Sequence, residues 1–387
     1  MSDDELAAQV NERWRLLSRN GGRARELVGE WMAAAGLLAR EDEAGNLIGR
    51  YEAAHGGALT LLLGAHCDPP PELNEVSERL LDPVGLLVAL ALVERLRARQ
   101  LRLPFALDIV AFAGRPDAID DRAPCPGTRA IVGTRLPGPS SRAARQTRPL
   151  WPAARRPEEL LGYCAIQVDS LGEVARLGQP LAVGLGIPGR TVVRATLAGP
   201  AGTPRRAGVV AQAGSDLTAA VARVASGRSG VGVGHSRHLT SPAGDADAST
   251  RVIALQLQHC DDAQRAASEQ QIHEEAAAIC RAADLTLDWA VEKEWPAVSC
   301  DPRLITLLGH AALAREVTPV LLPGAAAHDA VTLAAITPVA LLILRRADGL
   351  DHSPSYPGPP ASAADVALAI GVLGRFLELL AGDLLRR

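Results

Sequence analysis

The feature that most constrains the fold is a short, unbroken apolar segment at residues 59–65, which leads directly into His66. A run of this length without polar alternation predicts a strand that is buried on both faces, as in a parallel sheet. An apolar helix at residues 82–99 and a second apolar strand at residues 105–112 follow it. This alternation predicts an α/β fold, in which ligands bind at the carboxyl ends of the strands.

Residues 189–296 have a different pattern, with the order strand, helix, strand, strand, helix, strand. This order is typical of a split βαβ, ferredoxin-like unit. The α/β pattern then resumes with a helix at 302–315, a strand at 339–344 and a closing helix from residue 363. We therefore predict a discontinuous catalytic-type α/β domain with a central, mostly parallel sheet, formed by residues 1–188 and 297–387. Residues 189–296 form an inserted α+β domain.

Composition excludes several classes of function. The chain of 387 residues has a net charge of −4 and no long acidic or basic block, so neither nucleic acid nor a membrane surface is indicated as a partner. Its six cysteines include no Cys-x-x-Cys pair, and the N-terminus lacks the features of a secretory signal. We expect a cytoplasmic protein without a disulfide framework.

Several side chains that could bind metal stand at the predicted ends of strands and helices. Hydrolysis of an amide or ureido bond needs an activated water and stabilisation of charge on the carbonyl oxygen, which a bridged metal pair provides. His66 would be a ligand oriented by Asp68, Asp82 would bridge the ions, and His352 would be a late ligand. Each residue alone has an ordinary structural interpretation, and Asp82 is also a plausible helix N-cap. The occurrence of all these residues together, in this order along the chain, is more specific evidence for a metal site than any one of them alone.

Six short motifs carry a resemblance to a known family. They are Glu43-Ala44-Gly45-Asn46, Gly64-Ala65-His66-Cys67-Asp68, Asp82-Pro83-Val84-Gly85, Gly127-Thr128-Arg129-Ala130-Ile131-Val132-Gly133, Ala326-Ala327-His328-Asp329-Ala330 and Gly349-Leu350-Asp351-His352-Ser353-Pro354. Over nearly its whole length the chain resembles the zinc-dependent aminoacylase and carboxypeptidase superfamily, in its N-carbamoyl-amino-acid hydrolase and allantoate amidohydrolase branch. The resemblance implies that the inserted domain is a lid over a small substrate and supports dimerisation.

The departures from the family pattern are equally specific. Arg115 and Pro116 stand where the family has two glutamates, a general base and a metal ligand, and neither residue can perform these tasks. Ala165 replaces a ligand histidine and Pro200 replaces a histidine that polarises the substrate carbonyl. Gln258 replaces the arginine that clamps the substrate. We therefore expect that the standard two-metal mechanism has been lost.

Three states of the metal site are compatible with the sequence. One divalent ion, zinc or manganese, could be held by His66, Asp82 and His352. A restored pair would draw on nearby loop carboxylates, which are Glu72, Glu75, Glu78, Asp117, Asp120 and Asp121. The third state, with no specific metal, is the one that we favour from the sequence.

Two further features have competing interpretations. Cys67 and Cys164 lie beside ligand positions and could be nucleophiles, but strand alternation turns them away from the site and predicts that they are core residues. Residues 136–159 are rich in Pro, Arg and Ser, which predicts a surface loop or a gating segment whose arginines attract an anion.

Two classes of function remain open. In the first, which we favour, the chain is a diverged enzyme of small-molecule C–N bond chemistry that uses one ion or none. Asp68 and His328 would then be catalytic residues, and His328 and Gln258 would contact an amino-acid-like or ureido ligand. In the second, the chain is a catalytically silent pseudoenzyme that binds a ligand or a homologous partner subunit. We expect a homodimer, with a homologous partner subunit as the alternative.

Overall fold

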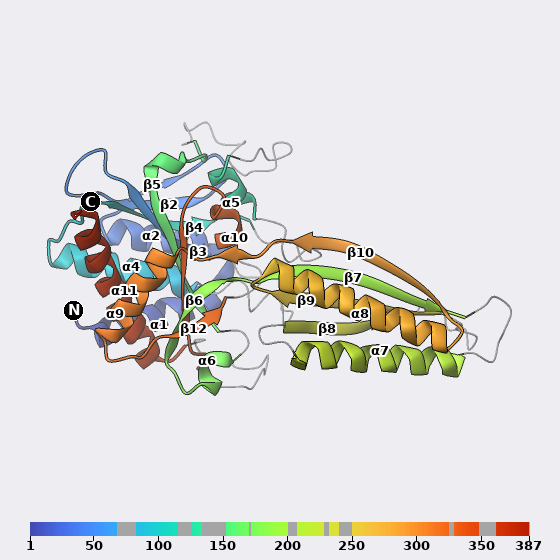
Figure 1. Ribbon diagram of the computed structural model, residues 1–387. Coiled ribbons are helices and arrows are strands. Elements are labelled where there is room, and N and C mark those ends of the chain that lie inside the picture. The colour runs from blue at the N-terminus through green and yellow to red at the C-terminus, as the bar shows by residue number, and fades with distance from the viewer. Residues whose placement is uncertain are drawn as a thin grey trace. The chain divides into compact units, whose positions relative to one another are not determined.

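A computed structural model describes residues 1–67, 83–114, 125–133, 152–169, 172–199, 207–227, 232–239, 250–324, 329–347 and 361–386 (Figure 1). The chain forms two compact units, which are Met1–Gly186 with Ser299–Arg387, and Ile187–Val298. The first unit has a mixed, largely parallel sheet and the second an antiparallel sheet with two helices. The predicted fold class, an interrupted α/β domain with an inserted α+β domain, is confirmed.

The first unit is built on one large sheet. Its described strands are β1 (Leu38–Glu41), β2 (Leu47–Tyr51), β3 (Thr60–His66), β4 (Ala106–Phe112), β5 (Leu160–Val168), β6 (Leu181–Ile187), β11 (Val298–Ser299), β12 (Val320–Pro323) and β13 (Val339–Leu344). They run in the order β1-β2-β4-β3-β5-β13-β6-β11, with β12 paired to β6. The central pairs β4/β3, β3/β5 and β5/β13 are parallel. Their carboxyl ends therefore meet at one edge of the sheet.

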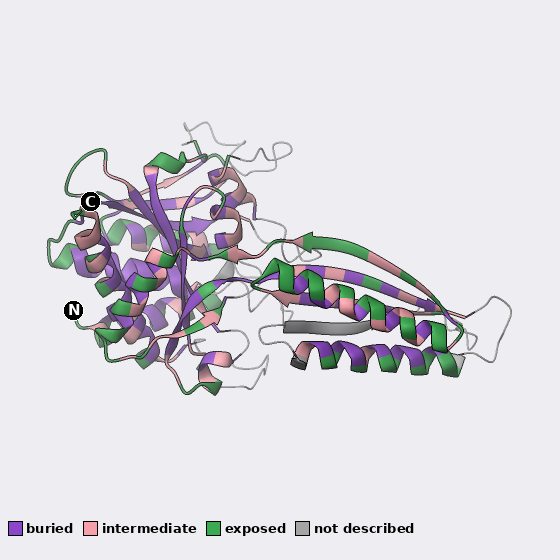
Figure 2. Ribbon diagram, viewed as in Figure 1, coloured by how far each residue is buried: buried purple, intermediate pink, exposed green. Residues whose placement is uncertain are grey.

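Helices cover both faces of this sheet. They are α1 (Asp3–Arg19), α2 (Ala24–Ala34), α4 (Val84–Ala98), α5 (Pro126–Ile131), α6 (Glu173–Arg176), α9 (Pro302–Leu313), α10 (Asp329–Leu333) and α11 (Ala363–Leu384). In Figure 1, α1, α4, α9 and α11 form a layer on one face, while α5 and α10 lie on the other. Helix α4 is apolar on nearly every side because it packs against β3, β4 and β5 and also against α1 and α11. The central strands are consequently buried (Figure 2).

The second unit contains β7 (Gly189–Ala198), α7 (Ala207–Gly227), β8 (Gly232–Leu239), β9 (Thr250–His259), α8 (Asp262–Ala282) and β10 (Thr286–Trp295). Its sheet has the order β10-β7-β9-β8 and every pair is antiparallel. Side chains of β7 alternate between buried and less buried, because α7 and α8 cover only one face. These contacts give the unit a hydrophobic core of its own.

Two short helical turns complete the described chain: 3-10 turns at Gly21–Arg23 and Pro157–Glu159. Among the described helices, none combines the length and the apolar character that crossing a membrane requires.

Candidate functional site

The candidate site lies where β3 ends. Strand β3 approaches β4 closely at Gly64, where a Cβ atom would lie 2.3 Å from the carbonyl oxygen of Val110. The buried Tyr163 hydroxyl donates a hydrogen bond to the Gly64 carbonyl oxygen, at 3.0 Å. Two residues later, the strand delivers His66, whose ring lies 5.9 Å from the ring of Phe112 on β4. The end of β3 is therefore fixed on both sides, and so is the imidazole that it carries.

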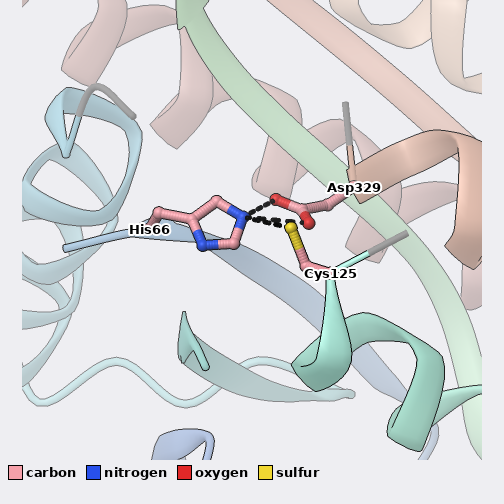
Figure 3. A group of neighbouring side chains, drawn as sticks. All are labelled: His66, Cys125 and Asp329. Atoms are coloured by element: carbon pink, nitrogen blue, oxygen red, sulfur yellow. Dashed lines mark hydrogen bonds and ion pairs between the residues drawn. The ribbon is translucent and has the colours of Figure 1, made fainter. Parts of the chain in front are cut away.

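The side chains of His66, Cys125 and Asp329, which carry metal-binding or proton-transferring groups, meet at one position (Figure 3). The Nε2 atom of His66 lies 3.1 and 3.0 Å from the two carboxylate oxygens of Asp329. The Sγ atom of Cys125 lies 3.4 Å from the same Nε2 atom. The His66 and Asp329 side chains are 5% and 8% exposed, and Cys125 is 5% exposed. A thiol, an imidazole and a carboxylate thus share one nearly water-free position.

A buried polar network positions Cys125. The Asn46 side chain donates to Asp42 and to the Gly127 carbonyl oxygen, at 2.7 and 3.1 Å, and accepts from the Ala113 N–H at 2.9 Å. It therefore joins the turn between β1 and β2 to the end of β4 and to the first turn of α5. The N-cap residue of α5 is Cys125, and its carbonyl oxygen accepts from the Thr128 hydroxyl at 3.1 Å.

Helix α10 supplies the third member of the group. Asp329 is its first residue, and α10 packs against α5, β5 and β13. Packing of α10 against α5 and β5, the neighbour of β3, brings Asp329 close to His66 although the sequence separates the two residues by 263 positions.

The charges in this group are coupled. Burial by itself would lower the pKa of His66, but the Asp329 carboxylate beside Nε2 raises that pKa well above its usual range. Burial raises the pKa of the Cys125 thiol, and its contact with His66 acts in the opposite direction. The Nδ1 atom of His66 is buried and has no hydrogen-bond partner among the residues that the structure describes. Figure 3 shows this nitrogen on the side of the ring away from Asp329 and Cys125.

Among the described residues, one group of side chains could hold a single metal ion. At the position of the family's ligand histidine, β5 carries Ala165, a buried methyl group that cannot bind a metal. Arg115 and Pro116, at the positions of the glutamates, supply no carboxylate either. By contrast, His66, Cys125 and Asp329 each direct one ligand atom into a common space, with all three atoms within 4.8 Å of one another.

The remaining predicted site residues divide into two groups. Gln258 lies on β9 of the second unit, where it is partly buried. The others lie outside the described residues, so their roles remain predictions: Asp68, Asp82, Arg115, Pro116, Pro200, His328, His352 and the loop carboxylates at 72, 75, 78, 117, 120 and 121. One interpretation is corrected, because the N-cap of α4 is Pro83 and not Asp82.

The sequence did not identify Cys125 or Asp329 as site residues. The available signals were weak: Cys125 is two residues before the Gly127–Gly133 motif, and Asp329 follows His328 in another motif. The core assignment of Cys67 and Cys164 is confirmed, since both are buried in the hydrophobic core of the first unit.

The part of the 136–159 segment that is described has a structural role. The Arg155 guanidinium pairs with the buried carboxylate of Asp108 at 2.9 Å, and Arg50 binds the same carboxylate at 3.0 Å. Its neighbour Arg156 pairs with Glu159 on the surface. These contacts give Arg155 a structural role beside Asp108, and attraction of an anion by the arginines of the segment remains a prediction. Residues 136–151 lie outside the described chain.

Comparison with known proteins agrees with the architecture of the chain. No family model matches it. The chain is 29% identical over 357 residues to an N-carbamoyl-L-amino acid amidohydrolase of Geobacillus stearothermophilus, covering 86% of this chain and 85% of the relative. It is 24% identical over 390 residues to an allantoate deiminase of Arabidopsis thaliana, covering 86% and 72% of the two chains.

A solved structure shows the same fold. It is a hydantoinase/carbamoylase family amidase from Burkholderia ambifaria, with a TM-score of 0.81, 20% identity, and coverage of 99% of this chain and 98% of the other. Sequence relatives and fold together support the resemblance of the chain to the N-carbamoyl-amino-acid hydrolase and allantoate amidohydrolase branch of the zinc-dependent aminoacylase and carboxypeptidase superfamily.

Proposed function

We propose that this protein is a diverged enzyme of small-molecule C–N bond chemistry that acts on amide or ureido substrates without the standard two-metal mechanism. The observation that carries the proposal is the buried group of His66, Cys125 and Asp329 at the end of β3. The named relatives, an N-carbamoyl-L-amino acid amidohydrolase and an allantoate deiminase, support the substrate class.

The energetics of this group favour a function over a structural remnant. Replacing a buried ion pair by apolar residues of similar size is often neutral or stabilising. A chain that needed only the fold would therefore lose little by replacing His66 and Asp329. The presence of both residues at a buried position supports a chemical role.

The site residues have distinct tasks in this proposal. His66 can exchange a proton with the Asp329 carboxylate or the Cys125 thiol, because both lie within reach of Nε2. Asp68 would orient the His66 ring and His328 would transfer a proton and contact the substrate, while Gln258 would contact the substrate from the inserted domain. A bound zinc or manganese ion would polarise the carbonyl group and activate water. The cytoplasmic location and the homodimer belong to the same proposal.

The test is a turnover assay with wild-type protein and two histidine variants. The substrates are N-carbamoyl-L-amino acids, allantoate and simple amides, and the readout is release of ammonia or amine. We expect turnover by the wild type and a loss of about 100-fold or more in His66→Ala, the size of a lost acid–base group. His310→Ala, on the exposed side of α9, is the matched control and should retain activity. Absence of turnover in wild-type protein supplied with zinc or manganese would overturn the proposal.

One observation favours a second candidate, a catalytically silent protein that binds a ligand or a homologous subunit. The buried methyl group of Ala165 occupies a position where the family pattern has a ligand histidine. This candidate predicts that an N-carbamoyl amino acid binds to the wild type in calorimetry but is recovered unchanged after prolonged incubation.

A further inference from the structure

We propose that His66, Cys125 and Asp329 form a mononuclear binding site for zinc or another thiolate-binding divalent ion. This ligand set differs from His66, Asp82 and His352, the set that the sequence suggested, because it includes a thiolate. The inference goes beyond the proposed function, since an ion can bind here whether or not the protein turns over a substrate.

Two of the separations among the three ligand atoms are close to those expected around a small tetrahedral ion. Zinc binds imidazole nitrogen and carboxylate oxygen at about 2.0–2.2 Å and thiolate sulfur at about 2.3 Å, so neighbouring ligands in a tetrahedron lie about 3.3 Å apart for N and O and about 3.6 Å for N and S. The corresponding distances are 3.0 Å between His66 Nε2 and Asp329 and 3.4 Å between His66 Nε2 and Cys125 Sγ. Outward movements of a few tenths of an ångström would admit the ion.

The chemistry of the donors selects the kind of ion. Thiolate and imidazole ligands favour zinc and cobalt, whereas magnesium and calcium prefer sites made of oxygen atoms. Because His66 and Cys125 are almost completely buried, the ion would be held away from bulk water. Three protein ligands are the usual number at a zinc site that keeps one position open.

The surroundings hold two of the ligands in place. The Asn46 network ties the start of α5, and thus Cys125, to the end of β4. Close packing at Gly64 fixes the strand that carries His66. Such support from the neighbouring residues is what keeps a metal ligand in its binding geometry.

If no ion is bound, the three side chains interact only through hydrogen bonds, and this arrangement leads to a different prediction. In that arrangement the Asp329 carboxylate accepts from the His66 Nε2–H, and the Cys125 thiol stays protonated. The two arrangements therefore differ in whether Cys125 binds a metal as a thiolate, and this difference can be measured.

The experiment uses full-length protein, purified under reducing conditions, stripped of metal and then loaded with zinc or cobalt. We expect about one ion per chain and, with cobalt, a thiolate-to-metal charge-transfer band in the near ultraviolet. Cys125→Ser should remove the band and weaken zinc binding at least about tenfold, and Asp329→Asn should weaken binding. Cys164→Ala, a change at another buried cysteine of the same unit, should leave both properties intact.

A second measurement needs no variant and therefore does not depend on the folding of Cys125→Ser. Zinc should slow alkylation of Cys125 in the wild-type protein, as followed by peptide mass spectrometry, while alkylation of the exposed Cys260 continues unchanged. The proposal is overturned if no ion binds, or if cobalt binds without a thiolate band and zinc leaves Cys125 alkylation unaffected. Turnover without ion binding would overturn this inference alone. Ion binding without turnover of any substrate would overturn the proposed enzyme and leave the inference standing.

Discussion

Cys125 and Cys164 are both buried cysteines of the first unit, but their surroundings differ. Cys125 lies against the His66 imidazole, whereas Cys164 belongs to the hydrophobic core. Burial among apolar side chains raises the pKa of Cys164 to about 12. Such a thiol is inert at neutral pH, which agrees with its interpretation as a small hydrophobic residue.

Because of Cys164, the free energy of unfolding should depend on pH in the alkaline range. Its pKa is raised from 9.0 to about 12, so above about pH 9 the unfolded chain releases a proton that the folded chain keeps. The free energy of unfolding should therefore fall between these pH values, by at most about 1.4 kcal/mol per pH unit from this thiol. Urea denaturation from about pH 8 to about pH 11 should show a shallower decline for Cys164→Ala. Cys260→Ala, at an exposed position, is the control. Equal declines for wild type and Cys164→Ala would contradict the assignment.

Site residues could be predicted only where a local pattern identifies them. His66 follows an apolar strand, and that position marks it as a candidate. Cys125 lies 59 positions from His66 and Asp329 lies 263 positions away, so no spacing connects them. Their meeting depends on the packing of α5 against α10, a contact that a single sequence does not reveal.

At the scale of single elements, the success of a prediction followed the strength of its local pattern. Strand β13 has the predicted bounds, because Val339–Leu344 is an unbroken apolar run between Pro338 and Arg345. Helix α7 (Ala207–Gly227) is less clearly marked in the sequence near its start. Its first turns contain two glycines, which weaken the helical pattern, but buried Val210 packs into the second core.

Strand β6 was not predicted as a strand, and its glycines explain why. Glycine weakens the strand pattern in the sequence but allows a close approach in the fold. At Gly184 on β6, a Cβ atom would lie only 2.5 Å from the Cβ atom of Leu341 on β13. The residue that obscures the strand in the sequence is therefore one that the packed sheet requires.

The first turn of α5 should tolerate no additional methyl group. A Cβ atom at Gly127 would lie 2.1 Å from Asn46 Oδ1 and 2.6 Å from the Ala113 nitrogen. We expect Gly127→Ala to lower the free energy of unfolding by about 1–3 kcal/mol, the usual cost of overpacking. Gly382→Ala, in the open face of α11, is the control and should raise stability by about 0.5–1 kcal/mol. Chemical denaturation measures both variants, and equal effects would contradict the proposed clash.

For the whole molecule, the order of the predicted elements was enough to identify the fold class. Two patterns of different rhythm, one of them interrupted by the other, indicated an α/β domain with an inserted α+β domain. The role of the inserted domain as a lid and dimerisation surface remains a prediction. The described residues of the hydrophobic core of the first unit all come from the two segments outside Ile187–Val298.

This separation predicts that the first unit folds alone. In a variant in which residues 187–298 are replaced by a glycine-serine linker of about four residues, we expect a single cooperative thermal transition followed by circular dichroism. The expected reason is that the first core keeps all its described members. A broad, non-cooperative transition would show that the first unit depends on the inserted one.

Strands β6 and β11, which lead into and out of the inserted unit, are neighbours in the large sheet, and the Cys300 N–H donates to the Leu185 carbonyl oxygen at 2.9 Å. The chain thus departs from and returns to almost the same place. An insertion connected in this way can change in length or sequence without altering the order of the strands in the large sheet. Evolution can therefore vary the inserted unit separately from the strand end that carries His66.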